Sequence, residues 1–367
     1  MRVAQVVGTN GKGTTTVALA AALEVAGVST GAYLSPHLLS YTERVMLRGE
    51  FLSEERFAAT MGGVLSLADA NGVPASQFEL LTAGALAIFA EEGLSWAVLE
   101  AGLGARYDAT SAASPEAVVL TNVDLDHMEY LGETVEEISH EKLASLSSGA
   151  VLIIGTDAPR VLAAARLRCT EVGARLVEAA TGEIRGDLPP YVARDVWLGL
   201  RAAEVVLDRV FSGEERVRVA RSIAGVLPGR FEVLYVRGVP VVVDGGHNPS
   251  GIRAALEAVR SVYGERPLGV VFGVLRDKDV GSMLSELRKE ACVLVLTRPE
   301  GERAAEPAHL MREHGPRDRE GRRARVAVDA RDALETAVEE IREKGGVVLV
   351  TGSLYTGVPV LRRLREE

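Results

Sequence analysis

The sequence predicts an α/β protein with two domains: a P-loop mononucleotide-binding domain on a mostly parallel sheet, and a smaller C-terminal Rossmann-like α/β domain. Three observations carry this prediction. A glycine-rich turn at residues 8–14 stands between an apolar run and a helical pattern. Short apolar runs of strand length alternate with helical patterns, which is typical of parallel sheets covered on both faces. Pro228 and Gly229 interrupt the pattern just before new strands. We therefore expect domains at residues 1–227 and 228–367.

The individual elements follow from apolar periodicity and from turn and cap residues. In the first domain we expect strand 3–7, helix 15–26, strand 29–33, an extended stretch 41–52, helix 53–70 with Ser53 as its cap, helix 78–92, strands 96–99 and 117–120, helix 134–146, strand 151–154 and helix 192–210. In the second we expect strands 233–236 and 239–243, helix 250–262, strand 268–272, helix 279–288, strand 292–296, helix 330–343, strand 347–350 and helix 355–364. Residues 182–191 should be irregular, and the charged residues 298–324 should form a solvated loop or an exposed helix.

Composition narrows the class of protein. The chain has 367 residues, 47% of them hydrophobic and 25% charged, as in ordinary globular proteins. Its net charge of −10 argues against binding to nucleic acid or to a membrane surface. The two cysteines exclude a disulfide scaffold and favour a reducing compartment. No signal peptide or membrane-spanning run is visible, so we expect a cytoplasmic protein. We also expect a monomer whose partners are small-molecule substrates.

The turn at residues 8–14 has the chemistry of a phosphate site. A strand, a glycine-rich turn and a helix place backbone N–H groups and a helix N-terminus around a phosphate. Lys12 supplies a positive charge, and Thr14 can offer its hydroxyl to Mg²⁺. Gly13 stands between these two residues and departs from the strict P-loop pattern. The alternative interpretation is a glycine-rich turn before a core helix.

Polar residues follow three of the predicted strands. Glu100 and Asp244 each come directly after a strand, and His127 lies a few residues past another. Ligands of open α/β sheets bind at the carboxyl ends of the strands, where a carboxylate and an imidazole suit Mg²⁺. Taken alone, Glu100 is better explained as an exposed strand-end acid and His127 as an ordinary loop histidine. Together with the phosphate loop they indicate a metal–nucleotide site.

The motifs as a set resemble the folylpolyglutamate synthetase/dihydrofolate synthetase family of the Mur ligase superfamily. The loop at residues 8–14 is similar to the GTNGKGS loop of that family, with its additional glycine. The remaining motifs follow in family order: SPHL at 35–38, ERV at 43–45, FE and LTA at 78–83, LEAGLGARYDAT at 99–110, LDH at 125–127, EK at 141–142, PGRF at 228–231, DGGHNP at 244–249, FGVLRDKD at 272–279 and GSLYT at 352–356.

The resemblance implies a role for each of these motifs. ATP would be bound by Thr9, Asn10, Gly11, Lys12, Gly13 and Thr14, and by Arg230 and Asp244. One Mg²⁺ would be held by Thr14, Ser35 and Glu100, and a second by Glu100, His127 and Lys142, whose family counterpart is carbamylated. The catalytic residues would be Lys12, His127, Lys142 and His247. Phe78, Glu79, Arg106, Tyr107, Asp108 and Ala109 would face the pterin substrate, and His247, Ser353 and Tyr355 would lie near the incoming glutamate.

The implied reaction is ATP-dependent amide formation. ATP would phosphorylate a folate-type carboxylate, and the amine of L-glutamate would attack the acyl phosphate. Dihydrofolate synthesis, polyglutamate extension and both together remain open. Another Mur-type ligase is an alternative, against which Gly13 and the SPHL motif speak. A nucleotide-binding homologue without ligase activity is another, against which the intact Lys12, Glu100, His127 and Lys142 speak.

Two departures from the family pattern stand out. Asp195 occupies the place of a family asparagine that contacts the nucleotide. The family also has a helical segment before the loop, whereas Met1 lies seven positions before Gly8 here. This implies either a start placed too late or a reduced pterin pocket.

Overall fold

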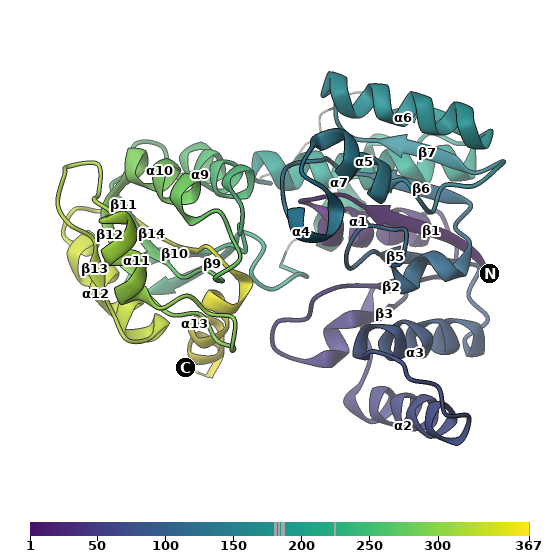
Figure 1. Ribbon diagram of the computed structural model, residues 1–367, viewed down its shortest axis with the longest axis horizontal. Helices are drawn as coiled ribbons and strands as arrows, with labels where there is room; N and C mark the ends of the chain where they lie inside the picture. The colour runs from purple at the N-terminus through teal and green to yellow at the C-terminus, as the bar shows by residue number, and fades with distance from the viewer. Residues whose placement is uncertain (180–181, 183, 185–187, 224, 367) are drawn as a thin grey trace. The chain divides into compact units, whose positions relative to one another are not determined.

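The computed structural model describes residues 1–179, 182, 184, 188–223 and 225–366. It divides the chain into two compact units, Met1–Leu188 with Val192–Val226 and Pro189–Tyr191 with Leu227–Glu367. Each unit is a sheet covered by helices (Figure 1), which confirms the predicted fold class. Part of the stretch 182–191, expected to be irregular, lies outside the described residues.

The first unit is built on an eight-stranded sheet in the order β4-β3-β2-β5-β1-β6-β7-β8. Its strands are β1 (Arg2–Val7), β2 (Thr30–Tyr33), β3 (Val45–Leu47), β4 (Glu50–Phe51), β5 (Trp96–Glu100), β6 (Ala117–Leu120), β7 (Val151–Ile154) and β8 (Arg175–Glu178). Among the described strands, β2, β5, β1, β6, β7 and β8 all run parallel, whereas β3 pairs antiparallel with both β2 and β4. The carboxyl ends of β2, β5, β1 and β6 therefore lie next to one another at one edge of the sheet.

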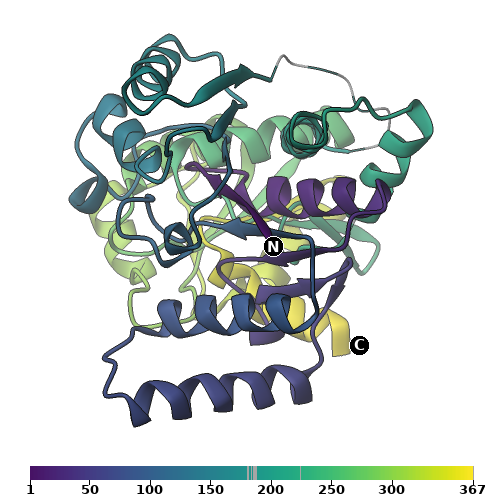
Figure 2. The ribbon, with the colours of Figure 1, turned by 90° about the vertical axis from the view of Figure 1, so that its right-hand side faces the viewer.

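Helices cover both faces of this sheet. They are α1 (Lys12–Val25), α2 (Glu54–Ala70), α3 (Gln77–Glu91), α4 (Met128–Leu131), α5 (Val135–Lys142), α6 (Pro159–Val172), α7 (Pro190–Leu207) and α8 (Gly213–Ile223), with 3₁₀ turns η1 (Tyr41–Arg44) and η2 (Ala109–Ala113). Helix α1 packs on β1, β2 and β5 and against α8. Helices α3, α5 and α6 lie over the other face, where their apolar residues pack against those of the strands. Helix α2 packs on α3 as an outer layer (Figure 2).

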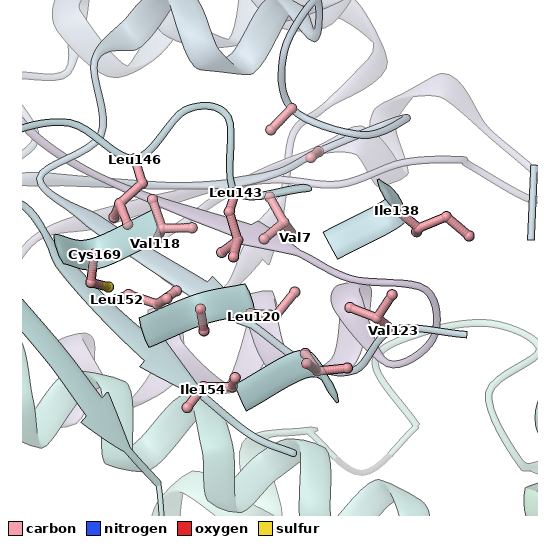
Figure 3. Packing of buried hydrophobic residues seen from close by; sticks show 14 of the residues in the cluster. Val7, Val118, Leu120, Val123, Ile138, Leu143, Leu146, Leu152, Ile154 and Cys169 are labelled. Atoms are coloured by element: carbon pink, nitrogen blue, oxygen red, sulfur yellow. The ribbon is translucent and has the colours of Figure 1, made fainter. Parts of the chain in front are cut away.

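Two apolar clusters fill the space under α3, α5 and α6. The cluster beneath α5 and α6 joins Val7, Val118 and Leu120 of the strands to Ile138 and Cys169 of the helices (Figure 3).

The cluster beneath α3 includes Phe89 and Leu94. Gly31 of β2 lies directly against these two side chains: a Cβ at Gly31 would come within 2.4 Å of the Phe89 ring and 2.9 Å of Leu94. The sheet and α3 can approach this closely only because residue 31 has no side chain.

The second unit is a six-stranded sheet in the order β13-β12-β11-β14-β10-β9. Its strands are β9 (Glu232–Val236), β10 (Val239–Val243), β11 (Leu268–Phe272), β12 (Ala291–Leu296), β13 (Arg325–Val326) and β14 (Val347–Thr351), and its helices are α9 (Pro249–Tyr263), α10 (Val280–Glu290), α11 (Pro307–His314), α12 (Ala330–Arg342) and α13 (Leu354–Glu366). Only β9 is antiparallel. Within the described residues, none of the helices combines the length and apolar character needed to cross a bilayer.

The structure corrects several expected elements. The stretch 41–52 is not one extended segment, because Glu43 accepts a hydrogen bond from Ser40 N (3.0 Å) and closes a capped 3₁₀ turn over Tyr41–Arg44. The charged stretch 298–324 contains α11, in which Pro307 and Leu310 are buried. Four further elements, α6, α8, β8 and β13, are not predicted by the sequence pattern. Arginine and glutamate interrupt the apolar pattern in α6, α8 and β8, and β13 is only two residues long.

The close contact at Gly31 leads to a prediction about stability. Gly31→Ala should destabilise the protein by about 1–3 kcal/mol, because the new methyl group overpacks the cluster beneath α3. Gly62→Ala is the matched control: it lies in α2, where an added Cβ meets nothing within 4 Å, and should stabilise by about 0.5–1 kcal/mol. Chemical denaturation followed by circular dichroism measures both. Equal effects of the two substitutions would contradict the packing described here.

Candidate functional site

The phosphate loop connects β1 to α1 at the edge formed by the strand ends. Gly8 has φ +149° and Gly11 has φ +82°, values that side-chain-bearing residues rarely adopt. A Cβ at Gly8 would lie 1.9 Å from Thr121 Oγ1. Glycine is therefore required for the loop to pass this close to the end of β6.

Residues directly after β6 fix the shape of the loop. Thr9 N donates to Asn122 O (3.0 Å) and Asn10 N to Asn122 Oδ1 (3.0 Å). Asn10 O accepts from Thr121 Oγ1 (2.7 Å), and Thr9 Oγ1 accepts from Asp124 N (3.0 Å). No role is predicted for these partners from the sequence, although they lie just past a strand that neighbours β1, which is a signal for contact with the loop.

Lys12 and Lys142 converge on one carbonyl oxygen of the loop. Lys12 Nζ donates to Gly8 O and to Thr9 O (3.2 Å each), and Lys142 Nζ, from the last turn of α5, donates to Gly8 O (2.8 Å). Lys142 is buried. Burial first, and then the positive charge of Lys12, lower the pKa of Lys142 to about 7, against the opposing effect of Asp126. Near neutral pH a substantial fraction of Lys142 is therefore an uncharged amine.

Oxygen donors gather near the loop at the neighbouring strand ends. Glu100 lies beside Val6 in the sheet register and is buried, and its Oε2 accepts from Ser35 N (2.9 Å). Thr14 is buried in the first turn of α1. The Glu100 carboxylate and the hydroxyls of Thr14 and Ser35 are hard oxygen ligands of the kind that Mg²⁺ prefers. In the described part of the chain no group of three or more His, Cys, Asp or Glu residues could hold a metal, so a metal here would need the hydroxyls.

His127 begins the short helix α4 in a left-handed conformation (φ +53°). Its backbone N donates to Asp126 Oδ1 (2.9 Å), and its Nε2 lies 4.0 Å from the same oxygen. The Asp126 carboxylate therefore constrains the backbone of His127 and lies close to its ring.

Asp195 of α7 borders the start of α1. It is buried, and a Cβ at Gly11 would lie 2.5 Å from its Oδ2. Thr15 Oγ1 donates to the backbone O of Asp195 (3.3 Å). The carboxylate thus lies at a helix N-terminus, where negative charge is favoured.

The segment after Glu100 is held by Asp108. Its Oδ2 accepts from Gly102 N (2.8 Å) and Leu103 N (3.0 Å), and its Oδ1 accepts from Thr110 N (3.0 Å) and Thr110 Oγ1 (2.5 Å). This carboxylate is saturated by its own loop, so it shapes the segment that carries the neighbouring predicted residues.

The other predicted residues of this segment are more exposed. Arg106 Nε donates to Glu141 Oε1 (2.7 Å), next to Lys142. The Tyr107 side chain is 93% exposed, and Ala109 opens η2. Arg106 thereby connects the segment after β5 to α5.

The start of α3 carries Phe78 and Glu79. The Phe78 ring lies 5.9 Å from that of Tyr33, and its edge would be 2.9 Å from a Cβ at Gly102. Glu79 closes a capping box by accepting from Ser76 N (2.7 Å), and hydrogen bonds from Ser76 lower the pKa of this exposed carboxyl. Glu79 therefore also anchors the helix end that presents Phe78.

A buried arginine connects two residues of the SPHL motif. Arg44 Nε donates to His37 Nδ1 (2.8 Å), and Arg44 Nη1 donates to Ser35 Oγ (3.3 Å). Burial first and the positive charge of Arg44 second lower the pKa of His37. Sequence analysis matched both motifs to a family but assigned no role to His37 or Arg44.

The remaining predicted residues lie in the second unit. The buried Asp244 accepts from Phe231 N (3.1 Å) and Gly246 N (2.9 Å), and a short bond comes from the Tyr191 hydroxyl. Asp244 is therefore held by three donors at the end of β10. Tyr191 was not anticipated, because it is far from Asp244 in sequence.

Other predicted residues surround Asp244 within this unit. The Arg230 guanidinium lies against Gly245, and His247 Nδ1 is 3.0 Å from Gly245 O. At the end of the neighbouring β14, Ser353 Oγ accepts from Tyr355 N (3.2 Å). The structure thus brings Thr9–Thr14, Ser35, Glu100 and Lys142 to one sheet edge of the first unit, and Asp244, His247 and Ser353 to strand ends of the second.

Comparison with known proteins identifies both units. The Mur ligase middle domain model matches residues 6–175, and the Mur ligase glutamate ligase domain model matches residues 229–354. Among the solved structures that match, two cover 99% of this chain and illustrate the likeness. They are the Mycobacterium tuberculosis folylpolyglutamate synthase complexed with ADP (TM-score 0.88, 26% identity, 90% of that chain) and a bifunctional folylpolyglutamate synthase/dihydrofolate synthase with Mn, AMPPNP and L-glutamate bound (TM-score 0.84, 30% identity, 89% of that chain).

Curated relatives agree with the structural matches. The Escherichia coli dihydrofolate synthase/folylpolyglutamate synthase is 30% identical over 376 residues, covering 97% of this chain and 85% of that protein. A probable bifunctional folylpolyglutamate synthase/dihydropteroate synthase of Halobacterium salinarum is 33% identical over 308 residues; the match covers 77% of this chain but only 38% of that longer protein. These matches confirm the resemblance drawn from the motifs: the chain belongs to the folylpolyglutamate synthase/dihydrofolate synthase family of Mur ligases.

Proposed function

We propose that this protein is an ATP-dependent ligase that joins L-glutamate to a folate-type carboxylate through an acyl phosphate. The observation that carries the proposal is the phosphate loop itself, with Lys12 and the buried Lys142 meeting at Gly8 O. Such a loop places the Lys12 ammonium group and a helix N-terminus where a transferred phosphoryl group would be bound, with the buried Lys142 beside them. Family membership supports the choice of glutamate and folate as substrates.

We propose separate binding roles for the two domains. We assign ATP binding to the domain 1–227 through Thr9, Asn10, Gly11, Lys12, Gly13 and Thr14, and glutamate ligation to the domain 228–367. Arg230 and Asp244 of the second domain would contribute to ATP binding as well. The pterin would be bound by Phe78, Glu79, Arg106, Tyr107 and Ala109, with Asp108 shaping their loop, and glutamate by His247, Ser353 and Tyr355. The acidic net charge supports small-molecule partners over nucleic acid, and the two buried free cysteines support a cytoplasmic location.

The residues near the loop fit divalent metal ions. Thr14, Ser35 and Glu100 supply hard oxygen donors for one Mg²⁺. Glu100, His127 and Lys142 would hold a second, provided that Lys142 carries a carbamate, because an ammonium group has no lone pair for a metal. The lowered pKa of Lys142 supplies the uncharged amine that reacts with CO₂. When bound, Mg²⁺ would neutralise charge on the phosphates of ATP.

The chain's own residues account for the steps of the reaction. Lys12 neutralises negative charge as the γ-phosphoryl group passes to the substrate carboxylate. The backbone N–H groups of the loop, fixed by the residues after β6, hold the phosphates in place. The glutamate amine, oriented by residues of the second unit, then attacks the acyl carbon, and phosphate leaves as the amide forms.

The proposed activity predicts that phosphate release depends on both acceptor and glutamate. With ATP, Mg²⁺ and L-glutamate, release should occur with dihydropteroate, tetrahydrofolate or both, and should stay at background without an acceptor. A phosphate-release assay with the three acceptor conditions, each run with and without glutamate, makes the measurement. Release that is the same in all conditions would contradict the proposal and indicate a plain ATPase.

The proposed carbamate predicts a specific loss at Lys142. Lys142→Ala should abolish turnover, and a ¹³C NMR carbamate signal from ¹³C-bicarbonate should be present in the native protein and absent in the variant. Lys289→Ala is the control, since this exposed lysine of α10 pairs only with Glu286 (2.7 Å) among the described residues. Unchanged turnover in Lys142→Ala would exclude the metal-ligand role.

The proposed role of Lys12 predicts a difference between binding and catalysis. If Lys12 acts mainly on the phosphoryl group in transit, Lys12→Ala should lower kcat by about 10²–10³-fold, as for other transition-state donors, and weaken ATP binding much less. Equilibrium binding of an ATP analogue and steady-state kinetics separate the two effects. Equal losses in both would instead assign Lys12 to uniform substrate binding.

A further inference from the structure

His37 is a polar residue of the SPHL motif that has no role in the proposed function. It is half-buried and lies two residues after Ser35, whose backbone N donates to Glu100. Its imidazole makes a 2.8 Å bond to Arg44, a residue that is itself only 7% exposed. Burying an arginine costs free energy unless its N–H groups are hydrogen-bonded. The bond to His37 therefore helps to hold Arg44 in its buried position.

The Arg44 contact determines which nitrogen of His37 carries the proton. The guanidinium is always charged and can only donate. Because Arg44 Nε donates to His37 Nδ1, this nitrogen must present its lone pair, and the ring proton then resides on Nε2. Among the residues that the structure describes, no protein group accepts a hydrogen bond from Nε2. His37 is thus a neutral imidazole with a donor available for a ligand.

The ring of His37 is also fixed from the side. It packs on Tyr41 with 4.0 Å between ring centroids, and Gln77 Nε2 donates to the Tyr41 hydroxyl (2.9 Å). Gln77 opens α3 immediately before Phe78. His37 is therefore connected on one side to the proposed metal ligands Ser35 and Glu100, and on the other to the start of the proposed pterin pocket.

We propose that His37 is a specificity-determining residue whose Nε2–H donates a hydrogen bond to an acceptor atom of the folate-type substrate. This inference rests on the proposed function. A folate-type substrate offers carbonyl and carboxylate oxygens and pterin nitrogens as acceptors. ATP offers acceptors as well, but the His37 ring packs on Tyr41, and Gln77 connects Tyr41 to the start of α3, which carries the proposed pterin residue Phe78. The KM for ATP is therefore measured beside that for the folate-type substrate.

Three substitutions of His37 distinguish the roles of its two ring nitrogens and leave the proposed ATP-binding residues unchanged. Asn places an acceptor near the position of Nδ1, so His37→Asn should keep the Arg44 bond and lose the Nε2 donor. Gln places an amide N–H near the position of Nε2, so His37→Gln should restore part of the donor function. His37→Phe keeps only the ring packing on Tyr41. His309→Asn, at an exposed histidine of α11 in the second unit, is the matched control.

We expect His37→Asn and His37→Phe to raise the KM for dihydropteroate by about 2- to 10-fold, the range of one neutral hydrogen bond, with the KM for ATP unchanged. His37→Gln should recover part of this loss, and His309→Asn should match the native protein. Imidazole ¹⁵N chemical shifts should report the proton of His37 on Nε2. Thermal melts of all variants identify any that fail to fold, and the ¹⁵N shifts of the native protein then still test the assignment.

Several results would overturn the inference. These are an unchanged dihydropteroate KM in a folded His37→Asn protein, an equal rise in the KM for ATP, no recovery in His37→Gln, or a proton on Nδ1. The native protein separates this inference from the function on which it rests. If the native protein shows no acceptor-dependent turnover, the proposed function fails; if it turns over normally and the His37 variants do not differ from it, only the inference fails.

Discussion

The architecture of the site depends on the hydrogen bonds that fasten the phosphate loop to the residues after β6. Thr9 and Asn10 are bonded through backbone and side-chain groups to Asn122 and its neighbours. These bonds join the residues that follow two adjacent parallel strands, β1 and β6. The shape of the loop therefore depends on the register between these strands. Preorganised donors stabilise a transition state better than mobile ones, because they need not reorganise during the reaction. A rigid attachment of the loop to the sheet supplies that condition.

The same constraint explains the properties of Lys142. The loop turns the carbonyl of Gly8 toward α5, where it accepts from a lysine that is nearly out of contact with water. The positive charge of Lys12 lies close by, so a second ammonium group is disfavoured there. A lysine in this position is suited to modification or to metal binding after modification, and poorly suited to serve as a permanent cation.

Much of the fold was predictable, because parallel sheets produce short apolar runs and glycine-rich turns that can be read locally. Strands β1, β5, β6 and β7 lie where the sequence placed them, and the phosphate loop has the expected strand–turn–helix context. The missed elements, such as α6 and α8, carry arginines that obscure a narrow apolar stripe. Their burial is decided by packing against α5 and α1, which a local pattern does not encode.

The candidate site was predictable as a set of positions but not as a set of contacts. Motif matching found Asp108 and Asp244, yet each carboxylate is occupied by donors of its own unit. The Tyr191 hydroxyl on Asp244 and the Arg44 guanidinium on His37 depend on three-dimensional proximity. Residue identity therefore indicated the chemistry, whereas the partners that orient each group required the structure.

The most direct test of the account is to follow oxygen from the acceptor carboxylate into phosphate. Dihydropteroate labelled with ¹⁸O in its carboxylate would be converted with ATP, Mg²⁺ and L-glutamate, and the released phosphate analysed by mass spectrometry. An acyl phosphate transfers one carboxylate oxygen to phosphorus, so the account predicts one ¹⁸O in each phosphate for every amide bond formed. Amide product accompanied by unlabelled phosphate would contradict it.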